Sequence, residues 1–349
     1  MHFFIRQRRM LMKFITFILS ISVLAGCTSH TKIPDTLAEK QTSYSYIPFD
    51  PLPVQTLEGA SCSTADNELR FKNKEIVLRN LKDSFPDQTV RLAVAEFTSD
   101  GTLNFGPSTI GYEGRSYQVI IDYANTDTTK GSFLVKREIS GQIPDVKWWG
   151  AEYTYPNYKK GQPLKLFEHV PNNVVSNYNV IVNPNDGLFS KLDENKELKS
   201  LFDLSNYDIQ DYELVNLPVY VGVGLRLTAT INVLNGNVNL SGLPAIAAEA
   251  KAGNLTGTLV VQTLGATGEL VSANLPLPSE LNQTTIQNSI LSLGSIKALL
   301  HDENIRITPR VIGIYNPIGG GQSFVNKVIS ALASERLTWY QPCDAIDKK

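Results

Sequence analysis

The sequence predicts an α+β fold, with a β-rich N-terminal domain that contains one helix and a C-terminal sheet, mixed or antiparallel, with helices on one face. Apolar and polar residues alternate over 219–233, as in a long strand with one buried side. Segments with helical spacing of apolar residues separate this strand from later strand-like runs. At roughly 150 residues per domain, the length of 349 residues indicates about two domains.

The first domain is expected over residues 61–165. Apolar spacing, with Thr64 or Asp66 as candidate cap, predicts a helix over 66–85. Runs rich in β-branched residues, separated by Gly or Asp-Gly turns, predict strands at 89–97, 102–110, 115–123 and 132–139.

The second domain is expected over residues 166–349 and starts with a helix predicted at about 188–203. In the strand at 219–233, one side is apolar: Val221, Val223, Leu225, Leu227, Ala229, Ile231 and Val233. The other side carries glycines and polar residues, which suit contact with solvent: Gly222, Gly224, Arg226, Thr228, Thr230 and Asn232.

Helices and strands continue to alternate towards the C-terminus. A helix is predicted at 243–252, a strand at 254–264 and a helix at 322–336. Thr284 to Gln287 resembles a capping box that starts a helix ending near Leu300, with a buried stripe of Ile286, Ile290, Leu293, Ile296 and Leu300. A strand at 305–315 contains Pro309, which favours an edge or a bulge there.

The start of the chain carries the most specific signal. The apolar stretch from Phe14 to Val23 is shorter than the roughly 20 residues that a membrane-spanning helix needs, and is typical of a secretory signal peptide. It leads into Leu24-Ala25-Gly26-Cys27, a box that resembles the lipobox of bacterial lipoprotein precursors. The resemblance implies that residues 1–26 are removed and that Cys27 becomes a diacylated first residue.

The mature chain then begins with a tether over residues 27–60, rich in Ser, Thr and Pro. The alternative for its apolar portion 46–54 is that it docks on the folded domain. Because Thr28 rather than Asp follows Cys27, the resemblance implies sorting to the outer membrane. Loss of residues 1–26 leaves 28 Lys and Arg against 34 Asp and Glu, a mildly acidic protein. The whole chain has a formal charge of -2, which argues against a nucleic-acid partner.

Two cysteines remain besides the one in the box. Cys62 and Cys343 form an even pair in a compartment where disulfides persist, so a bond between them is expected. The alternative is two separate buried thiols, because a free cysteine behaves as a small apolar residue.

An aromatic cluster lies between the two predicted domains. Its rings have an apolar body and a polar tip, as in a surface that contacts a ligand or a partner: Trp148, Trp149, Tyr153, Tyr155 and Tyr158. The alternative is that these rings fill the junction between the domains.

The sequence offers no catalytic, metal or cofactor motif. His30, His169 and His301 are isolated from acids and cysteines at ligand spacing. The glycine run at 319–321 before Ser323 lacks the Lys of a phosphate-binding loop, so a turn is favoured over an anion site.

These observations predict a non-enzymatic lipoprotein of the cell envelope, anchored in the outer membrane and facing the periplasm. It would act as a binding or assembly module with an envelope protein as partner. The alternative is a subunit of an oligomeric outer-membrane secretion channel or pore, in which strands 221–233 and 254–264 cross the membrane.

Overall fold

A computed structural model describes a large part of the chain. The described residues are 45–58, 74–85, 87–106, 108–142, 158–168, 170, 174–183, 187–192, 198–200, 209–299 and 305–347. All of them belong to one compact unit, Pro34–Lys349.

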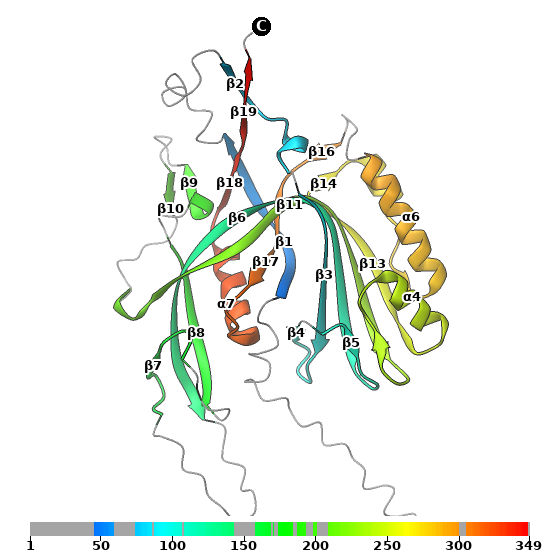
Figure 1. Ribbon diagram of the computed structural model, residues 1–349, viewed down its shortest axis with the longest axis horizontal. Coiled ribbons are helices and arrows are strands. Elements are labelled where there is room, and N and C mark those ends of the chain that lie inside the picture. Colours follow the sequence, from blue (N-terminus) through cyan, green and yellow to red (C-terminus); the bar gives the residue numbers. More distant parts are fainter. Residues whose placement is uncertain are drawn as a thin grey trace, which may run out of the picture. The chain divides into compact units, whose positions relative to one another are not determined.

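Two long antiparallel strands form the centre of the main sheet (Figure 1). They are β6 (Ser116–Gln142) and β11 (Glu213–Val233), which pair from Ser116 opposite Asn232 to Val135 opposite Glu213. β3 (Asp87–Phe97) pairs with the first half of β6, and β4 (Leu103–Gly106) pairs with β3.

The free edges of the two central strands are each shared by two neighbours. On β11, the first half pairs with β17 (Arg310–Asn316) and the second half with β13 (Leu255–Leu264). β8 (Val174–Val182) pairs with the second half of β6. Beyond β17 lie β1 (Ser45–Glu58) and then β18 (Leu337–Gln341), which runs parallel to β1. Residues 45–58 of the predicted tether are therefore part of the sheet, in line with the alternative that 46–54 docks on the folded domain.

Short strands complete the described part of the fold. β7 (Pro163–Leu164) extends the sheet beside β6, and β15 (Ser279–Glu280) beside β13. Four further pairs stand apart from it: β2 (Lys74–Leu78) with β19 (Cys343–Asp347), β5 (Ile110–Gly111) with β12 (Val238–Asn239), β9 (Ser190–Leu192) with β10 (Leu198–Ser200), and β14 (Ala266–Thr267) with β16 (Arg306–Ile307). The 3-10 turns are η2 (Leu81–Ser84), η3 (Gly187–Phe189) and η5 (Ile209–Asp211).

Four α-helices lie in the described residues. α4 (Leu243–Lys251) and α6 (Gln283–Leu299) lie beside β13 (Figure 1), and α5 (Glu269–Asn274) packs against α6 and β14. They cover one core, which includes Leu227, Ile246, Leu259 and Ile296. α7 (Gly321–Ser334) packs against β8 and closes a second core around Phe133, Val219 and Phe324.

The mixed α+β class is therefore correct, although strand predominates in the described residues. The predicted elements at 219–233, 243–252, 254–264 and 322–336 correspond to β11, α4, β13 and α7. Pro309 falls in the gap between β16 and β17, as its missing N–H favours. The strands predicted at 115–123 and 132–139 are one continuous strand, β6.

Two predicted helices are wrong where the structure describes them. Within 66–85, residues 74–78 form β2, because they pair with β19 at the far end of the chain. Within 188–203, residues 190–192 and 198–200 form the hairpin of β9 and β10. In both cases pairing with another strand overrides the local apolar spacing.

The sheet also joins strands from the two predicted domains. β3 and β6 come from 61–165, whereas β11, β13 and β17 come from 166–349, and they pair in one sheet. The long shared edge of β6 and β11 brings the two halves of the sequence together.

Candidate functional site

The middle of the sheet carries two different rows of side chains, one on each face. Val90, Tyr123 and Leu225 are opposite one another in β3, β6 and β11. The next row along the same strands is Arg91, Asp122 and Arg226. Because successive residues of a strand point to opposite faces, the first row is apolar on one face and the second is charged on the other.

The charged row holds a buried ion pair. Arg226 Nε donates to Asp122 Oδ1 at 2.7 Å, and its Nη2 donates to Oδ2 at 2.7 Å. The side chains are 3% and 0% exposed. The guanidinium also donates to the backbone oxygens of Phe49 and Ile312, at 2.6 and 2.8 Å. Arg226 therefore ties β11 to β6, β1 and β17.

This position corrects the expectation that Arg226 lies on a solvent-facing side of its strand. β17 pairs with β11 at residues 219–222, β1 pairs with β17, and backbone oxygens of both strands accept hydrogen bonds from the guanidinium. The apolar side of β11 is buried as predicted, from Val221 to Val233.

Tyr46 and Arg91 lie beside this ion pair and form a polar cluster with it. The Tyr46 hydroxyl donates to Asp122 Oδ2 at 2.5 Å. Burial and the neighbouring Asp122 carboxylate raise the pKa of Tyr46 well above its ordinary value of 10.0. The Arg91 guanidinium lies 4.0 Å from the centre of the Tyr220 ring and donates to the Thr126 hydroxyl. Each of these groups has a protein partner, so the cluster holds strands together and does not offer a free reactive group.

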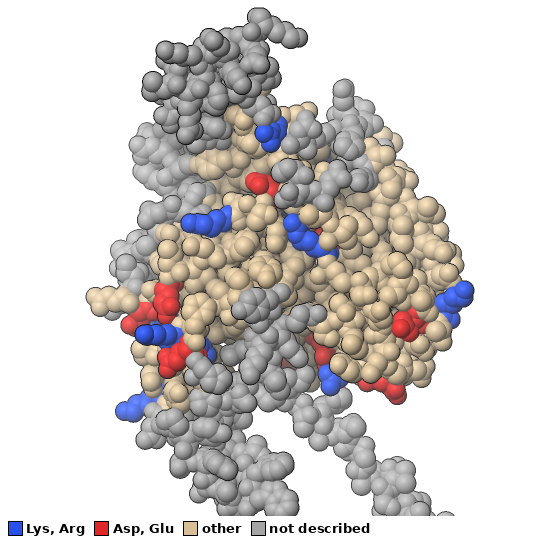
Figure 2. All heavy atoms as spheres, viewed as in Figure 1, with Lys and Arg blue, Asp and Glu red and all other residues tan. Residues whose placement is uncertain are grey.

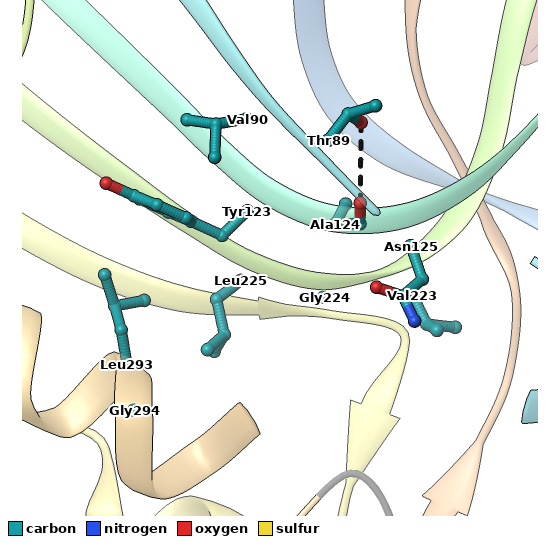
Figure 3. Close-up of a pocket in the computed structure, with 10 residues that line it drawn as sticks. All are labelled: Thr89, Val90, Tyr123, Ala124, Asn125, Val223, Gly224, Leu225, Leu293 and Gly294. Carbon is teal, nitrogen blue, oxygen red and sulfur yellow. Dashed lines mark hydrogen bonds between the residues drawn. The ribbon is translucent and has the colours of Figure 1, made fainter. Parts of the chain in front are cut away.

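The apolar row lines a hollow between the sheet and α6 (Figure 3). We call it the α6 hollow; its volume is about 260 Å³. Its lining consists of Thr89, Val90, Tyr123, Ala124, Asn125, Val223, Gly224, Leu225, Leu293 and Gly294. Figure 3 shows the strands on one side, with Leu293 and Gly294 contributed by the helix on the other.

Two glycines allow β6 and β11 to come close beside the hollow. A Cβ atom on Gly224 would lie 2.2 Å from the backbone oxygen of Tyr123, and one on Gly222 would lie 2.3 Å from that of Asn125. No other residue fits at these positions without moving the backbone, since the obstructing atoms are carbonyl oxygens.

α6 forms the outer wall of the hollow through its cap and its buried side. Its first turn is closed by a capping box in which the Thr285 N–H donates to Asn282 Oδ1 at 2.9 Å and the Asn282 N–H donates to Thr285 Oγ1 at 3.0 Å. The predicted start at Thr284 is therefore wrong by two residues. In the predicted buried stripe, Ile290 is 43% exposed and Ser289 is buried instead, donating to the Thr285 backbone oxygen.

The surface outside the hollow is poor in charge. From residue 281 to residue 296 the sequence has no Asp, Glu, Lys or Arg. On the face shown in Figure 2, most of the area over α6 is tan, and charged side chains appear near its lower end and scattered elsewhere. Leu291 is 71% exposed and Val90 is 63% exposed, so apolar surface continues outside the α6 hollow.

The chemistry of the α6 hollow is that of binding. Its hydroxyl-bearing residues are Thr89 and Tyr123, and its remaining lining has no acid, base or thiol. Among the described residues, no group of three or more His, Cys, Asp or Glu side chains gathers where it could hold a metal ion. The arrangement can bury apolar surface and offers an amide, Asn125, at its border.

Most residues singled out in the sequence lie outside the described part: Cys27, Cys62, Trp148, Trp149, Tyr153 and Tyr155. Tyr158 is half-buried and packs against the small cluster of Ile139, Leu164, Val170 and Val174. Cys343 starts β19, where it is opposite Leu78 of β2.

The glycines at 319–321 have positive φ angles and lead into α7, which begins at Gly321. A Cβ atom on Gly320 would lie 2.7 Å from that of Phe324. This run is therefore a turn with a steric need for glycine, in line with the favoured expectation.

Sequence reasoning did not find the α6 hollow. Val90, Tyr123 and Leu225 are far apart in the chain and meet only through strand register. One available signal was the run 281–296, which has no charged residue and contains Leu291 and Gly294, because a surface helix usually has a charged or polar face.

Comparison with known proteins gives no relative: the chain matches no family model, no curated protein and no solved structure. Within the described residues, the helices are too short or too polar to cross a membrane.

Proposed function

We propose that this protein is a non-enzymatic lipoprotein of the cell envelope, anchored in the outer membrane through Cys27. Its folded unit would face the periplasm as a binding or assembly module. The observation that carries the proposal is the box Leu24-Ala25-Gly26-Cys27 directly after a short apolar stretch. The binding role is supported by the α6 hollow, which is apolar and opens at an exposed Val90.

The second candidate is a pore subunit in which strands 221–233 and 254–264 cross the outer membrane. In that role the apolar side of β11 would face lipid. Leu227 and Ile231 instead belong to the core that α4 and α6 cover. The helical layer would have to leave the sheet before these side chains could meet lipid, so the packing favours the first proposal.

A disulfide between Cys62 and Cys343 belongs to the same proposal. It is supported by the pairing of β19 with β2, since β2 begins at Lys74, twelve residues after Cys62. Non-reducing peptide mapping should recover one peptide pair joined through these two cysteines. Two alkylatable thiols in the unreduced, denatured chain would contradict this pairing.

Fatty-acid labelling in cells, followed by membrane fractionation, tests the anchor. The Cys27→Ala variant should leave the lipoprotein maturation route, so the fatty-acid label on the protein should disappear. The Cys62→Ala variant, which lacks another cysteine of the same chain, should keep the label and stay with the outer-membrane fraction. Equal fatty-acid labelling of the Cys27→Ala variant and the unchanged chain would overturn the proposal.

A further inference from the structure

We propose that the α6 hollow binds one uncharged alkyl chain, such as that of a fatty alcohol or a neutral lipid. The inference rests on the binding role proposed above and names its ligand class. It does not depend on the lipid anchor at Cys27.

The size of the α6 hollow limits the ligand. Its volume of about 260 Å³ exceeds the roughly 150 Å³ of an apolar protein cavity that accepts a benzene molecule. It lies just below the roughly 300 Å³ at which pockets for drug-sized molecules begin. One alkyl chain or one small ring fits this range, whereas a dinucleotide or a polycyclic cofactor does not.

The charge of the lining selects for an uncharged ligand. None of the ten lining residues is Asp, Glu, Lys, Arg or His. The nearest charged row, Arg91, Asp122 and Arg226, points to the opposite face of the sheet, and its charges are engaged there. Burying a carboxylate or an ammonium group in the hollow would therefore cost free energy without an opposite charge to offset it.

Two polar groups at the hollow can serve an uncharged head. The Tyr123 hydroxyl and the Asn125 side-chain amide have no hydrogen bond to another described residue. Burial raises the pKa of Tyr123 above its ordinary value of 10.0, as expected beside a poorly hydrated space. A ligand hydroxyl could donate or accept a hydrogen bond here, and an ester oxygen could accept one, while the hydrocarbon contacts Leu225 and Leu293.

The entrance has the same character as the lining. Val90 belongs to the hollow and is also 63% exposed, so the hollow opens to solvent beside β3. The neighbouring helix presents Leu291 within the uncharged run 281–296. A chain that leaves the hollow therefore meets apolar, uncharged surface.

Competition with a fluorescent probe tests the inference. The chain from Thr28 onward retains the whole compact unit Pro34–Lys349 and avoids the need for detergent, which would itself occupy the site. Its binding of N-phenyl-1-naphthylamine, an uncharged apolar probe, is followed by fluorescence. We expect 1-decanol to displace the probe at about one tenth of the concentration required for decanoate or decylammonium. Burying the carboxylate or ammonium head of either competitor in the uncharged hollow costs free energy that decanol does not pay.

Filling the hollow should abolish this binding. A Cβ atom on Gly294 has nothing within 4 Å, so Gly294→Phe adds a ring without a backbone clash. We expect it to weaken decanol binding by about tenfold or more, while Asn288→Phe, on another side of α6, keeps the original affinity. Val90→Asp places a charge at the entrance and should act like Gly294→Phe, with Ile110→Asp on exposed β5 as its control.

The outcomes are separable from those of the anchoring test. Absence of decanol binding to folded protein, equal binding of decanol and decanoate, or unchanged binding by both Gly294→Phe and Val90→Asp would each overturn the inference. None of these results bears on fatty-acid labelling at Cys27, which is measured in cells.

Discussion

Arg226 and Asp122 form a buried bidentate ion pair in the middle of the sheet, with both bonds at 2.7 Å. They are direct cross-strand neighbours in β11 and β6. The remaining donors of the guanidinium reach backbone oxygens of β1 and β17. One residue thus joins segments from the beginning, the middle and the end of the described chain.

The stability losses from removing the two partners of this pair should not be additive. Arg226→Met leaves the Asp122 carboxylate buried without a counter-charge, and we expect a loss of about 3–5 kcal/mol in the free energy of unfolding. Asp122→Leu combined with Arg226→Met should cost less than the two single losses added together. Urea unfolding of the two single variants and the double variant measures the coupling.

The exposed pair of Arg115 and Glu96, at 2.8 Å, provides the matched control. Because its side chains are 45% and 25% exposed, Arg115→Met should cost no more than about 1 kcal/mol. Strict additivity of the Asp122 and Arg226 losses would contradict the coupling inferred from the geometry.

Stability should fall at alkaline pH through Tyr46. Its pKa in the folded protein lies above the ordinary 10.0, so the folded state keeps a proton that the unfolded chain has lost. This contribution to stability is fully present below about pH 10 and is lost as the pH rises through the folded-state value.

The Tyr46→Phe variant isolates this effect from other tyrosines. It lacks the titrating hydroxyl, so its urea midpoint should decline less steeply above about pH 10 than that of the unchanged protein. Identical alkaline slopes for the two proteins would show that Tyr46 ionises equally in both states.

Replacing glycine with alanine should have opposite effects on stability at two positions that line the α6 hollow. Gly224→Ala brings a methyl group against the Tyr123 carbonyl oxygen, and we expect a loss of about 1–3 kcal/mol or more. Gly294→Ala meets open space in a helix and should gain up to about 1 kcal/mol. Thermal unfolding of the two variants should move in opposite directions; a shift in the same direction would contradict the close packing of β6 on β11.

The start of α6 offers a test of its cap. Asn282→Ala removes the side-chain acceptor for the Thr285 N–H and should cost about 1 kcal/mol. Thr284→Ala, two residues on, removes an exposed side chain and should change stability by no more than about 0.5 kcal/mol. A larger loss of stability from Thr284→Ala than from Asn282→Ala, measured by urea unfolding, would identify Thr284 as the cap.

The sequence predicts elements well where local pattern and tertiary packing agree. Alternation over 219–233 identifies β11, and the small residues at 243–252 identify α4, because each segment buries the side that its pattern indicates. Residues 74–78 lie within the run 66–85, whose apolar spacing predicts a helix, but they form a strand with 343–347, and the partner of a strand this distant cannot be deduced from local pattern. Ile290 lies outside the core for a similar reason, since the position of α6 on the sheet sets which side it buries.

The candidate site was the least predictable part. Val90, Tyr123 and Leu225 lie side by side only because the register of three strands aligns them. The alternation predicts a solvent-facing position for Arg226. The strands β1 and β17, whose backbone oxygens bind its guanidinium, are distant in sequence and leave no local signal. Strand register and contacts with distant strands are long-range properties that local pattern does not contain. The Cys27 box is a contiguous motif and can be recognised directly in the sequence.

Mass spectrometry of the N-terminal peptide of protein isolated from cell membranes tests the central claim most directly. We predict a chain that begins at Cys27, with a mass increase that corresponds to a diacylglyceryl group on this residue. A chain that still carries residues of the 1–26 segment, with an unmodified Cys27 thiol, would contradict the proposed lipoprotein.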